Sequence, residues 1–254
     1  MKCIVRAIPN TITVFNLLAG CMAIVFALRG WTDFAVYCIF AAAVFDFCDG
    51  LSARLLKAYS ELGKQLDSLA DMVSFGIAPA ALLHNKLNVL LSDRITGGFD
   101  SGLVWELWTF FPFILAVFSA LRLAKFNIDD RQSHRFIGLP TPACALLTGV
   151  LVSLSVRGHW LAGWMEQWYS IIILSALLSA LLVCSLPMFA LKFKSLRWRD
   201  NKTVFIFILL CLFILFGALI FRQGILFAMA VIFFAYICLS FIRSLFHKKI
   251  NKKP

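Results

Sequence analysis

The chain has 254 residues, of which 61% are hydrophobic and 15% are charged, and its mean hydropathy is +0.89. A soluble domain of this size could not bury so much apolar surface, so the composition excludes one and indicates a polytopic membrane protein. The formal net charge of +11 could suggest a nucleic-acid partner. However, most of the basic residues lie between apolar segments, so we expect them to set membrane topology and expect no nucleic-acid binding.

Apolar segments long enough to span a bilayer follow one another along the chain. A spanning helix needs about 20 predominantly apolar residues. We therefore expect an all-α polytopic membrane bundle of about eight transmembrane helices, forming one domain over residues 1–254. The expected helices cover 11–29, 32–56, 66–88, 104–125, 139–157, 168–190, 203–221 and 224–245. Turns are expected at Gly30, the Gly97–Gly98 pair, Gly158 and Gly224.

The basic residues between these segments predict the orientation of the chain. Of the 24 Lys and Arg residues, 19 lie at the two termini or in the second-to-third, fourth-to-fifth and sixth-to-seventh connections. The other five lie in the alternate connections. The positive-inside rule then places both termini in the cytoplasm, and we expect a bacterial inner membrane.

Acidic residues gather at the cytoplasmic ends of the second and third expected helices. Asp46 and Asp49 are three positions apart, and Asp67 and Asp71 are four apart. Both spacings put the two side chains on one face of a helix. Because the connection between these helices is short, we expect antiparallel neighbours that bring all four carboxylates together near the membrane–cytoplasm boundary.

Such a cluster requires compensation for its charge. One Asp well inside a membrane costs about 2.5–3.5 kcal/mol on insertion scales. Oxygen ligands suit Mg²⁺, Mn²⁺ or Ca²⁺, and two such ions would neutralise four carboxylates, an arrangement that favours phosphoryl transfer. Alternatively, the aspartates could be ordinary interfacial charges paired with Arg54, Lys57 and Lys64, or mark the pathway of a cation transporter. A transporter predicts acids spread through the membrane rather than clustered at one end.

The acidic residues form part of a longer pattern, which resembles a known family. The pattern is similar to the signature of the CDP-alcohol phosphotransferases, and it reads Asp46-x₂-Asp49-Gly50-x₂-Ala53-Arg54-x₈-Gly63-x₃-Asp67-x₃-Asp71. The resemblance implies a metal-dependent membrane enzyme that moves a substituted phosphate from a CDP-alcohol to a second alcohol and releases CMP. It also implies that the four aspartates hold two divalent ions and that Asp71 is the general base.

The same resemblance implies which residues bind the two substrates. The residues expected to bind the CDP-lipid are Asn10, Thr13, Gly50, Ala53, Arg54, Ser60 and Gly63. Two stretches, SALRLAKFN (119–127) and FIGLPTPACA (136–145), resemble the phosphatidylserine synthase branch. They imply that the substrates are CDP-diacylglycerol and L-serine. The residues expected to bind serine are Asn16, Arg122, Lys125 and Asn127, although glycerol-3-phosphate or an inositol acceptor would also require positive charge.

The C-terminal part of the chain carries little chemistry. After Asp130 the only acidic residues are Glu166 and Asp200. We therefore expect residues 168–245 to provide scaffold, lipid contacts or a subunit interface, such as that of a homodimer.

Overall fold

The structure is a computed structural model, and it describes residues 2–96, 99–128, 136–184, 187–188 and 202–250. The described chain is helical, except for one antiparallel pair of two-residue strands, β1 (Phe136–Ile137) and β2 (Pro187–Met188). Each apolar segment expected to span the membrane falls mainly on helix, but the expected segment 168–190 extends past the helix that ends at Val183, and its positions 185–186 and 189–190 lie outside the described residues. The expected turn at Gly97–Gly98 lies outside the described residues.

The first half of the chain forms two long helices and two longer, interrupted ones. The first two helices are α1 (Lys2–Leu28) and α2 (Thr32–Leu55). Next, α3 (Glu61–Asp71) continues without a break through a π-helix, η1 (Met72–Ile77), into α4 (Ala78–Thr96). Then α5 (Phe99–Thr109) is joined to α6 (Ile114–Ile128) by the 3₁₀ turn η2 (Phe111–Phe113), which contains Pro112.

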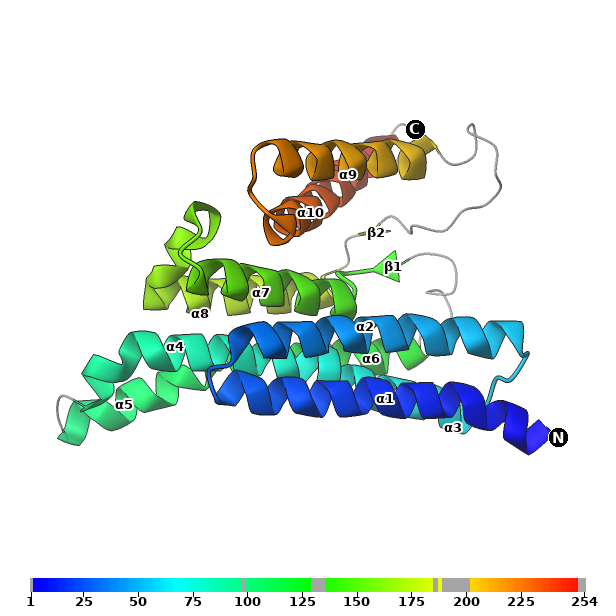
Figure 1. Cartoon of the computed structure of the whole chain (residues 1–254), viewed down its shortest axis with the longest axis horizontal. Helices are drawn as coiled ribbons and strands as arrows, with labels where there is room; N and C mark the ends of the chain where they lie inside the picture. Colours follow the sequence, from blue (N-terminus) through cyan, green and yellow to red (C-terminus); the bar gives the residue numbers. More distant parts are fainter. Residues whose placement is uncertain (1, 97–98, 129–135, 185–186, 189–201, 251–254) are drawn as a thin grey trace.

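The second half consists of shorter helices and a terminal hairpin. It contains α7 (Thr141–Val156), the 3₁₀ segment η4 (Trp160–Glu166), α8 (Trp168–Val183), α9 (Lys202–Ile220) and α10 (Ile225–Ile250). Figure 1 shows α1, α2, α3, α4 and α6 as one group, with α7 and α8 packed over it. The hairpin of α9 and α10 lies outermost and contacts α7 through α10.

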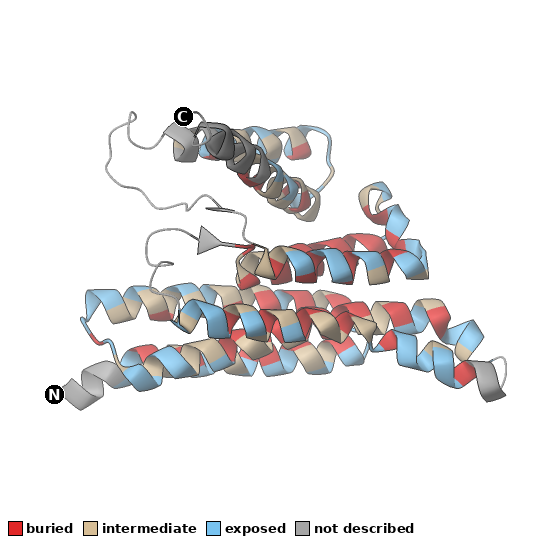
Figure 2. Ribbon diagram, turned by 180° about the vertical axis from the view of Figure 1, so that it is seen from behind, coloured by how far each residue is buried: buried red, intermediate tan, exposed pale blue. Residues whose placement is uncertain are grey.

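The hydrophobic core lies between these layers. Figure 2 shows buried residues concentrated in the middle of the bundle, where inner helix faces meet. The largest fully buried side chains include Ile39, Phe75, Leu83, Leu87 and Leu151, which come from α2, η1, α4 and α7. The core therefore includes residues of α1, α2 and η1, and α3 is joined to it through η1, which continues from it without a break.

Within the described residues, four helical stretches are long and apolar enough to cross a membrane, namely Ala7–Leu28, Thr32–Leu55, Glu61–Thr96 and Gly102–Ile128. A fifth crossing is counted if α7 and η4, which meet at an 88° bend, form one span. Three shorter apolar helices follow, at Trp168–Val183, Phe207–Ile220 and Ile225–Ser240. The expected membrane bundle is therefore present, with four to five spans supported by length and composition.

Several helices end in the same left-handed turn. Gly30, Gly158 and Gly224, where turns were expected, have φ values of 77°, 65° and 82°. The C-terminal end of α2 uses Lys57 instead, with φ at 51° and the N–H of Ala58 donating to the carbonyl of Ala53. This is a Schellman motif with lysine at the position that glycine normally occupies.

Candidate active site

Three of the four aspartates form a compact group of oxygen ligands. Asp46 and Asp49 project from α2 and Asp67 from α3, and one carboxylate oxygen from each lies within 4.8 Å of the others. The connection between the two helices covers only residues 56–60, so they run antiparallel. It ends at Ser60, whose hydroxyl accepts a hydrogen bond from the backbone N–H of Gly63 at 3.0 Å and so caps α3.

Two polar side chains of α1 reach this group. Thr13 Oγ1 donates a hydrogen bond of 2.6 Å to Asp49 Oδ2, and Asn16 Nδ2 donates one of 3.3 Å to Asp71 Oδ1. All four side chains belong to buried residues. Because Thr13 and Asn16 are three positions apart, they occupy one face of α1, and that face holds a carboxylate from each of the two neighbouring helices.

Asp71 is buried, as Asp49 is, and lies directly before an irregular turn. It is the last residue of α3, it lies beside Asp46, and the π-helix η1 follows it. Within η1, Ser74 donates a hydrogen bond of 3.0 Å to the backbone carbonyl of Asn16. A Cβ at Gly20 would collide with Ser74, so α1 approaches η1 at this point as only glycine allows. Single π-turns inside α-helices occur frequently at functional sites.

No Lys or Arg side chain forms a salt bridge with these aspartates within the described part of the chain. There the ion pairs are Lys86 with Glu166 and Arg157 with Asp33, each at 3.0 Å. The alternative interpretation, in which Arg54, Lys57 and Lys64 pair with the aspartates, therefore has no ion pair to support it among the described residues. A group of carboxylate oxygens at this spacing, without nitrogen or sulfur ligands, fits a hard divalent ion such as Mg²⁺, Mn²⁺ or Ca²⁺.

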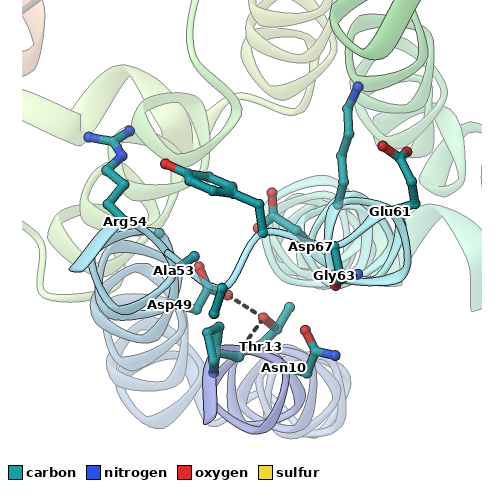
Figure 3. A pocket seen from close by; sticks show the side chains of 14 residues that line it. Asn10, Thr13, Asp49, Ala53, Arg54, Glu61, Gly63 and Asp67 are labelled. Atoms are coloured by element: carbon teal, nitrogen blue, oxygen red, sulfur yellow. Dashed lines mark hydrogen bonds between the residues drawn. The ribbon is translucent and has the colours of Figure 1, made fainter. Parts of the chain in front are cut away.

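A cavity of about 690 Å³ opens beside the acidic group, between α1, α2 and α3. Figure 3 shows Asn10 and Thr13 on α1, Asp49, Ala53 and Arg54 on α2, and Asp67 on α3 around it. All the residues that the family resemblance implies bind the CDP-lipid line this cavity. They are Asn10, Thr13, Gly50, Ala53, Arg54, Ser60 and Gly63.

The cavity also contains residues that the sequence did not suggest. These are Ala58, Tyr59, Glu61 and Lys64. Most of them belong to the α2–α3 connection or the first turn of α3, and their position within the motif was the only available signal. Lys64 had been interpreted as a topology charge, and its Nζ donates to the backbone carbonyl of Asn127 at 3.3 Å.

The two motif glycines have different surroundings. A Cβ added at Gly63 would lie 2.8 Å from Asn10 Oδ1 and 2.9 Å from Ser60 Oγ, so this glycine allows α1 and α3 to approach each other. A Cβ at Gly50 would meet nothing within 4 Å and would project into open space. Gly50 therefore leaves room beside the cavity, whereas Gly63 is required by packing.

The residues expected to bind serine are not in one place. Asn16 is fully buried against Asp71, and Arg122 Nη1 donates to Thr141 Oγ1 at 3.1 Å. Asn127 donates from Nδ2 to Ser68 Oγ at 2.8 Å on the outer side of α3, and Lys125 is exposed. The set therefore divides into an inner pair near Asp71 and an outer pair at the end of α6.

Comparison with known proteins shows that the similarity to this family covers most of the chain and not only the motif. The family model of CDP-alcohol phosphatidyltransferases matches residues 6–175, which include α1 to α7 and the complete acidic site. A protein from Helicobacter pylori named CDP-diacylglycerol–serine O-phosphatidyltransferase is 31% identical over 212 residues, covering 82% of this chain and 81% of that protein.

Two further relatives carry the same name. One from Mycobacterium leprae is 35% identical over 190 residues, covering 72% of this chain and 58% of that longer protein. One from Bacillus subtilis is 35% identical over 144 residues, covering 57% of this chain and 74% of that protein. With its acidic motif, adjoining cavity and matching family model, the chain belongs to the CDP-alcohol phosphatidyltransferase family.

Proposed function

We propose that the protein is a CDP-diacylglycerol–serine O-phosphatidyltransferase, which converts CDP-diacylglycerol and L-serine to phosphatidylserine and CMP in phospholipid synthesis. The observation that carries this proposal is that the carboxylates of Asp46, Asp49 and Asp67 lie together beside a cavity. Four further motif residues, Gly50, Ala53, Arg54 and Gly63, line that cavity. The names of the relatives favour serine as the acceptor over glycerol-3-phosphate or an inositol compound.

The four aspartates are the proposed metal ligands. Asp46, Asp49, Asp67 and Asp71 would hold two divalent ions, Mg²⁺ or Mn²⁺, with Ca²⁺ as a further candidate. Bound there, the ions would neutralise the diphosphate and stabilise both the transferring phosphate and the departing CMP. Thr13 would hold the Asp49 carboxylate in its ligating orientation, since hydrogen bonds to ligands fix their geometry.

The donor lipid would occupy the cavity, with its acyl chains in the bilayer. The proposed contacts are Asn10, Thr13, Gly50, Ala53, Arg54, Ser60 and Gly63. Arg54 carries a fixed positive charge that suits a phosphate oxygen. Gly50 leaves its side of the cavity open for the ligand. Both substrates would then meet at one membrane surface, so positioning itself contributes to the rate.

Asp71 is the proposed general base, and Asn16 would orient it. Its carboxylate would accept the proton of the serine hydroxyl. The serine oxygen would form a bond to the lipid-bearing phosphorus while the bond from that phosphorus to the CMP oxygen breaks. Asn16, Arg122, Lys125 and Asn127 are the proposed serine-binding residues, with the first two nearest the base.

The placement in the membrane is proposed on the charge distribution. The 19 basic residues on one side, against five on the other, favour cytoplasmic termini and a site that faces the cytoplasm of a bacterial cell. Figure 1 supports this arrangement, because the start of α1 and the α2–α3 connection lie at the same end of the bundle. We propose one domain over residues 1–254, in which α8, α9 and α10 complete about eight spans and provide lipid contacts or a homodimer interface.

The test is CMP release by the purified protein in detergent with CDP-diacylglycerol and Mn²⁺ or Mg²⁺. Serine, glycerol-3-phosphate, inositol and inositol phosphate are supplied in parallel. We expect release with serine alone, lost in Asp71→Asn and retained in Asp93→Asn, which changes an exposed aspartate of α4 outside the site. Release with a different acceptor would refute the serine assignment, and a folded, metal-loaded protein without release for any acceptor would refute the reaction.

A further inference from the structure

The stretch FIGLPTPACA, residues 136–145, contributes no residue to the substrate contacts proposed above. It consists of strand β1, a turn from Gly138 to Pro140, and the start of α7. Thr141, the first residue of α7, is only 1% exposed, and its Oγ1 accepts a hydrogen bond of 3.1 Å from Arg122 Nη1. This stretch therefore contacts one member of the proposed serine-binding set directly.

The C-terminal half of the chain fixes the position of Thr141. Gly138 has a φ of 79°, and a Cβ there would collide with the backbone carbonyl of Leu182 at the end of α8. The next residue, Leu139, donates its N–H to the carbonyl of Leu181 at 2.9 Å. Strand β1 pairs with β2, and β2 contacts α10. Because glycine tolerates this conformation, the turn packs closely against α8 and fixes the start of α7.

Helix α10 brings a second side chain to the same guanidinium. Tyr236 is 9% exposed, and its ring packs edge-on against Phe207 of α9, with the ring centroids 5.9 Å apart. Because α10 packs against α7, the Tyr236 hydroxyl lies near enough to Arg122 for the two groups to interact electrostatically. Tyr236 lies beyond residues 6–175, which match the family model. A helix outside that matched region therefore borders the Arg122 side chain.

The restraint on Arg122 matters because Asp71 attracts it. The two groups interact electrostatically, although they form no salt bridge within the described part of the chain. An arginine side chain is long and has many rotamers. A guanidinium paired with Asp71 would occupy both the proposed base and the proposed contact for a carboxylate. Thr141 instead holds Nη1 at the start of α7, and the buried Nε, which has no hydrogen-bond partner among the described residues, can donate to a ligand.

We infer that Thr141 and Tyr236 position the Arg122 guanidinium for the carboxylate of the acceptor, and that they thereby set the affinity for the acceptor. This inference rests on the proposed function, in which Arg122 binds serine. Thr141 acts through its hydrogen bond to Nη1, and Tyr236 acts through the electrostatic interaction of its hydroxyl. Both act through Arg122, so they are positioning residues. The stretch 136–145 and the hairpin of α9 and α10 thus gain a role in acceptor binding, although neither contains an acidic residue.

The first experiment measures the KM for L-serine and for CDP-diacylglycerol in Thr141→Val. The matched control is Thr148→Val, which removes an equally buried hydroxyl of the same helix, one that donates to the carbonyl of Cys144. We expect Thr141→Val to raise the KM for L-serine about tenfold, as the loss of a hydrogen bond to a charged group would. The KM for CDP-diacylglycerol should stay within twofold of the wild type. Thr141→Ser, which keeps the hydroxyl, should restore most of the affinity for L-serine.

The second experiment measures the same two KM values in Tyr236→Phe. This substitution keeps the ring against Phe207 and removes only the hydroxyl. The control is Tyr169→Phe, which removes the hydroxyl of a half-exposed tyrosine on α8. We expect Tyr236→Phe to raise the KM for L-serine about fivefold and to leave the KM for CDP-diacylglycerol unchanged. Tyr169→Phe should change neither value.

Three results would overturn the inference. The first is a Thr141→Val enzyme whose thermal stability falls while its KM for L-serine stays within twofold of the wild type, because the hydroxyl would then serve only the fold. The second is an equal rise of both KM values in Thr141→Val, because the effect would then not be specific to the acceptor. The third is a Tyr236→Phe enzyme that behaves as Tyr169→Phe does. Failure of the proposed function differs from all three, since the wild type itself would then release no CMP with L-serine.

Discussion

The hydrogen bond between Thr13 and Asp49 provides the sharpest test of the metal assignment. Replacing Thr13 with valine keeps the shape of the side chain but removes the hydroxyl that donates a hydrogen bond of 2.6 Å to Asp49 Oδ2. Both residues are buried, with 3% and 5% of their surface exposed, so water does not readily replace the lost donor. A hydrogen bond to a charged group contributes about 1.5–3 kcal/mol, which corresponds to roughly a 10- to 150-fold change in an equilibrium constant.

The assay is the Mn²⁺ concentration that gives half-maximal CMP release. We expect Thr13→Val to raise it about 10- to 100-fold, the range typical for loss of a group that orients a metal ligand, with partial recovery in Thr13→Ser. The control is Thr11→Val, since Thr11 is exposed on the same helix and bonds only the carbonyl of Ala7 in the described hydrogen-bond network. A midpoint for Thr13→Val within twofold of the wild type would refute the claim that this bond positions a metal ligand.

Three further predictions concern the donor cavity, the metal and the α2 terminus. Gly63→Ala should lower the free energy of unfolding in detergent by about 1–3 kcal/mol and raise the KM for CDP-diacylglycerol, because the added Cβ would displace Asn10. The control is Gly50→Ala, whose added Cβ meets open space, and this variant should be no less stable than the wild type. Chelation of divalent ions should abolish CMP release, and adding Mn²⁺ or Mg²⁺, but not Zn²⁺, should restore it. Restoration of CMP release by Zn²⁺ would argue against a ligand set made only of oxygen atoms. Lys57→Gly should raise the unfolding temperature, because a lysine at φ 51° carries a steric cost that glycine avoids, and the free energy of unfolding should rise by about 1 kcal/mol. A lower unfolding temperature in this variant would contradict the assignment of strain to Lys57.

The sequence was most informative where chemistry and helical periodicity agree. The spacings of Asp46 with Asp49 and of Asp67 with Asp71, together with a short connection, predicted antiparallel helices with facing carboxylates. The structure contains three of the four within 4.8 Å. The position of Asp71 could not be read from its spacing, because it depends on how α1 and η1 pack against α3. A π-helix has no clear periodic signal, so η1 was not predicted.

Other differences in the fold have equally specific causes. The expected helix at 104–125 is interrupted at Pro112, which lacks a backbone donor and can therefore end a run of helical hydrogen bonds. That interruption was available from the sequence. By contrast, the 88° bend between α7 and η4 depends on the left-handed turn at Gly158, and an apolar pattern cannot distinguish a continuous span from a bent one. The bend therefore decides whether a fifth span is counted, and the last three expected segments are shorter apolar helices within the described residues.

Helix α1 contributes to every part of the site although it contains no acidic residue. Asn10 lines the donor cavity, Thr13 holds Asp49, Asn16 holds Asp71, and Gly20 admits Ser74. Their spacings of three, three and four place them along one face of the helix. One rigid helix therefore touches the donor cavity, the metal ligands, the proposed base and the π-turn behind it. Because these contacts share one backbone, a rotation or slide of α1 would disturb donor binding and acceptor activation together, whereas a change at one side chain should affect only its own partner.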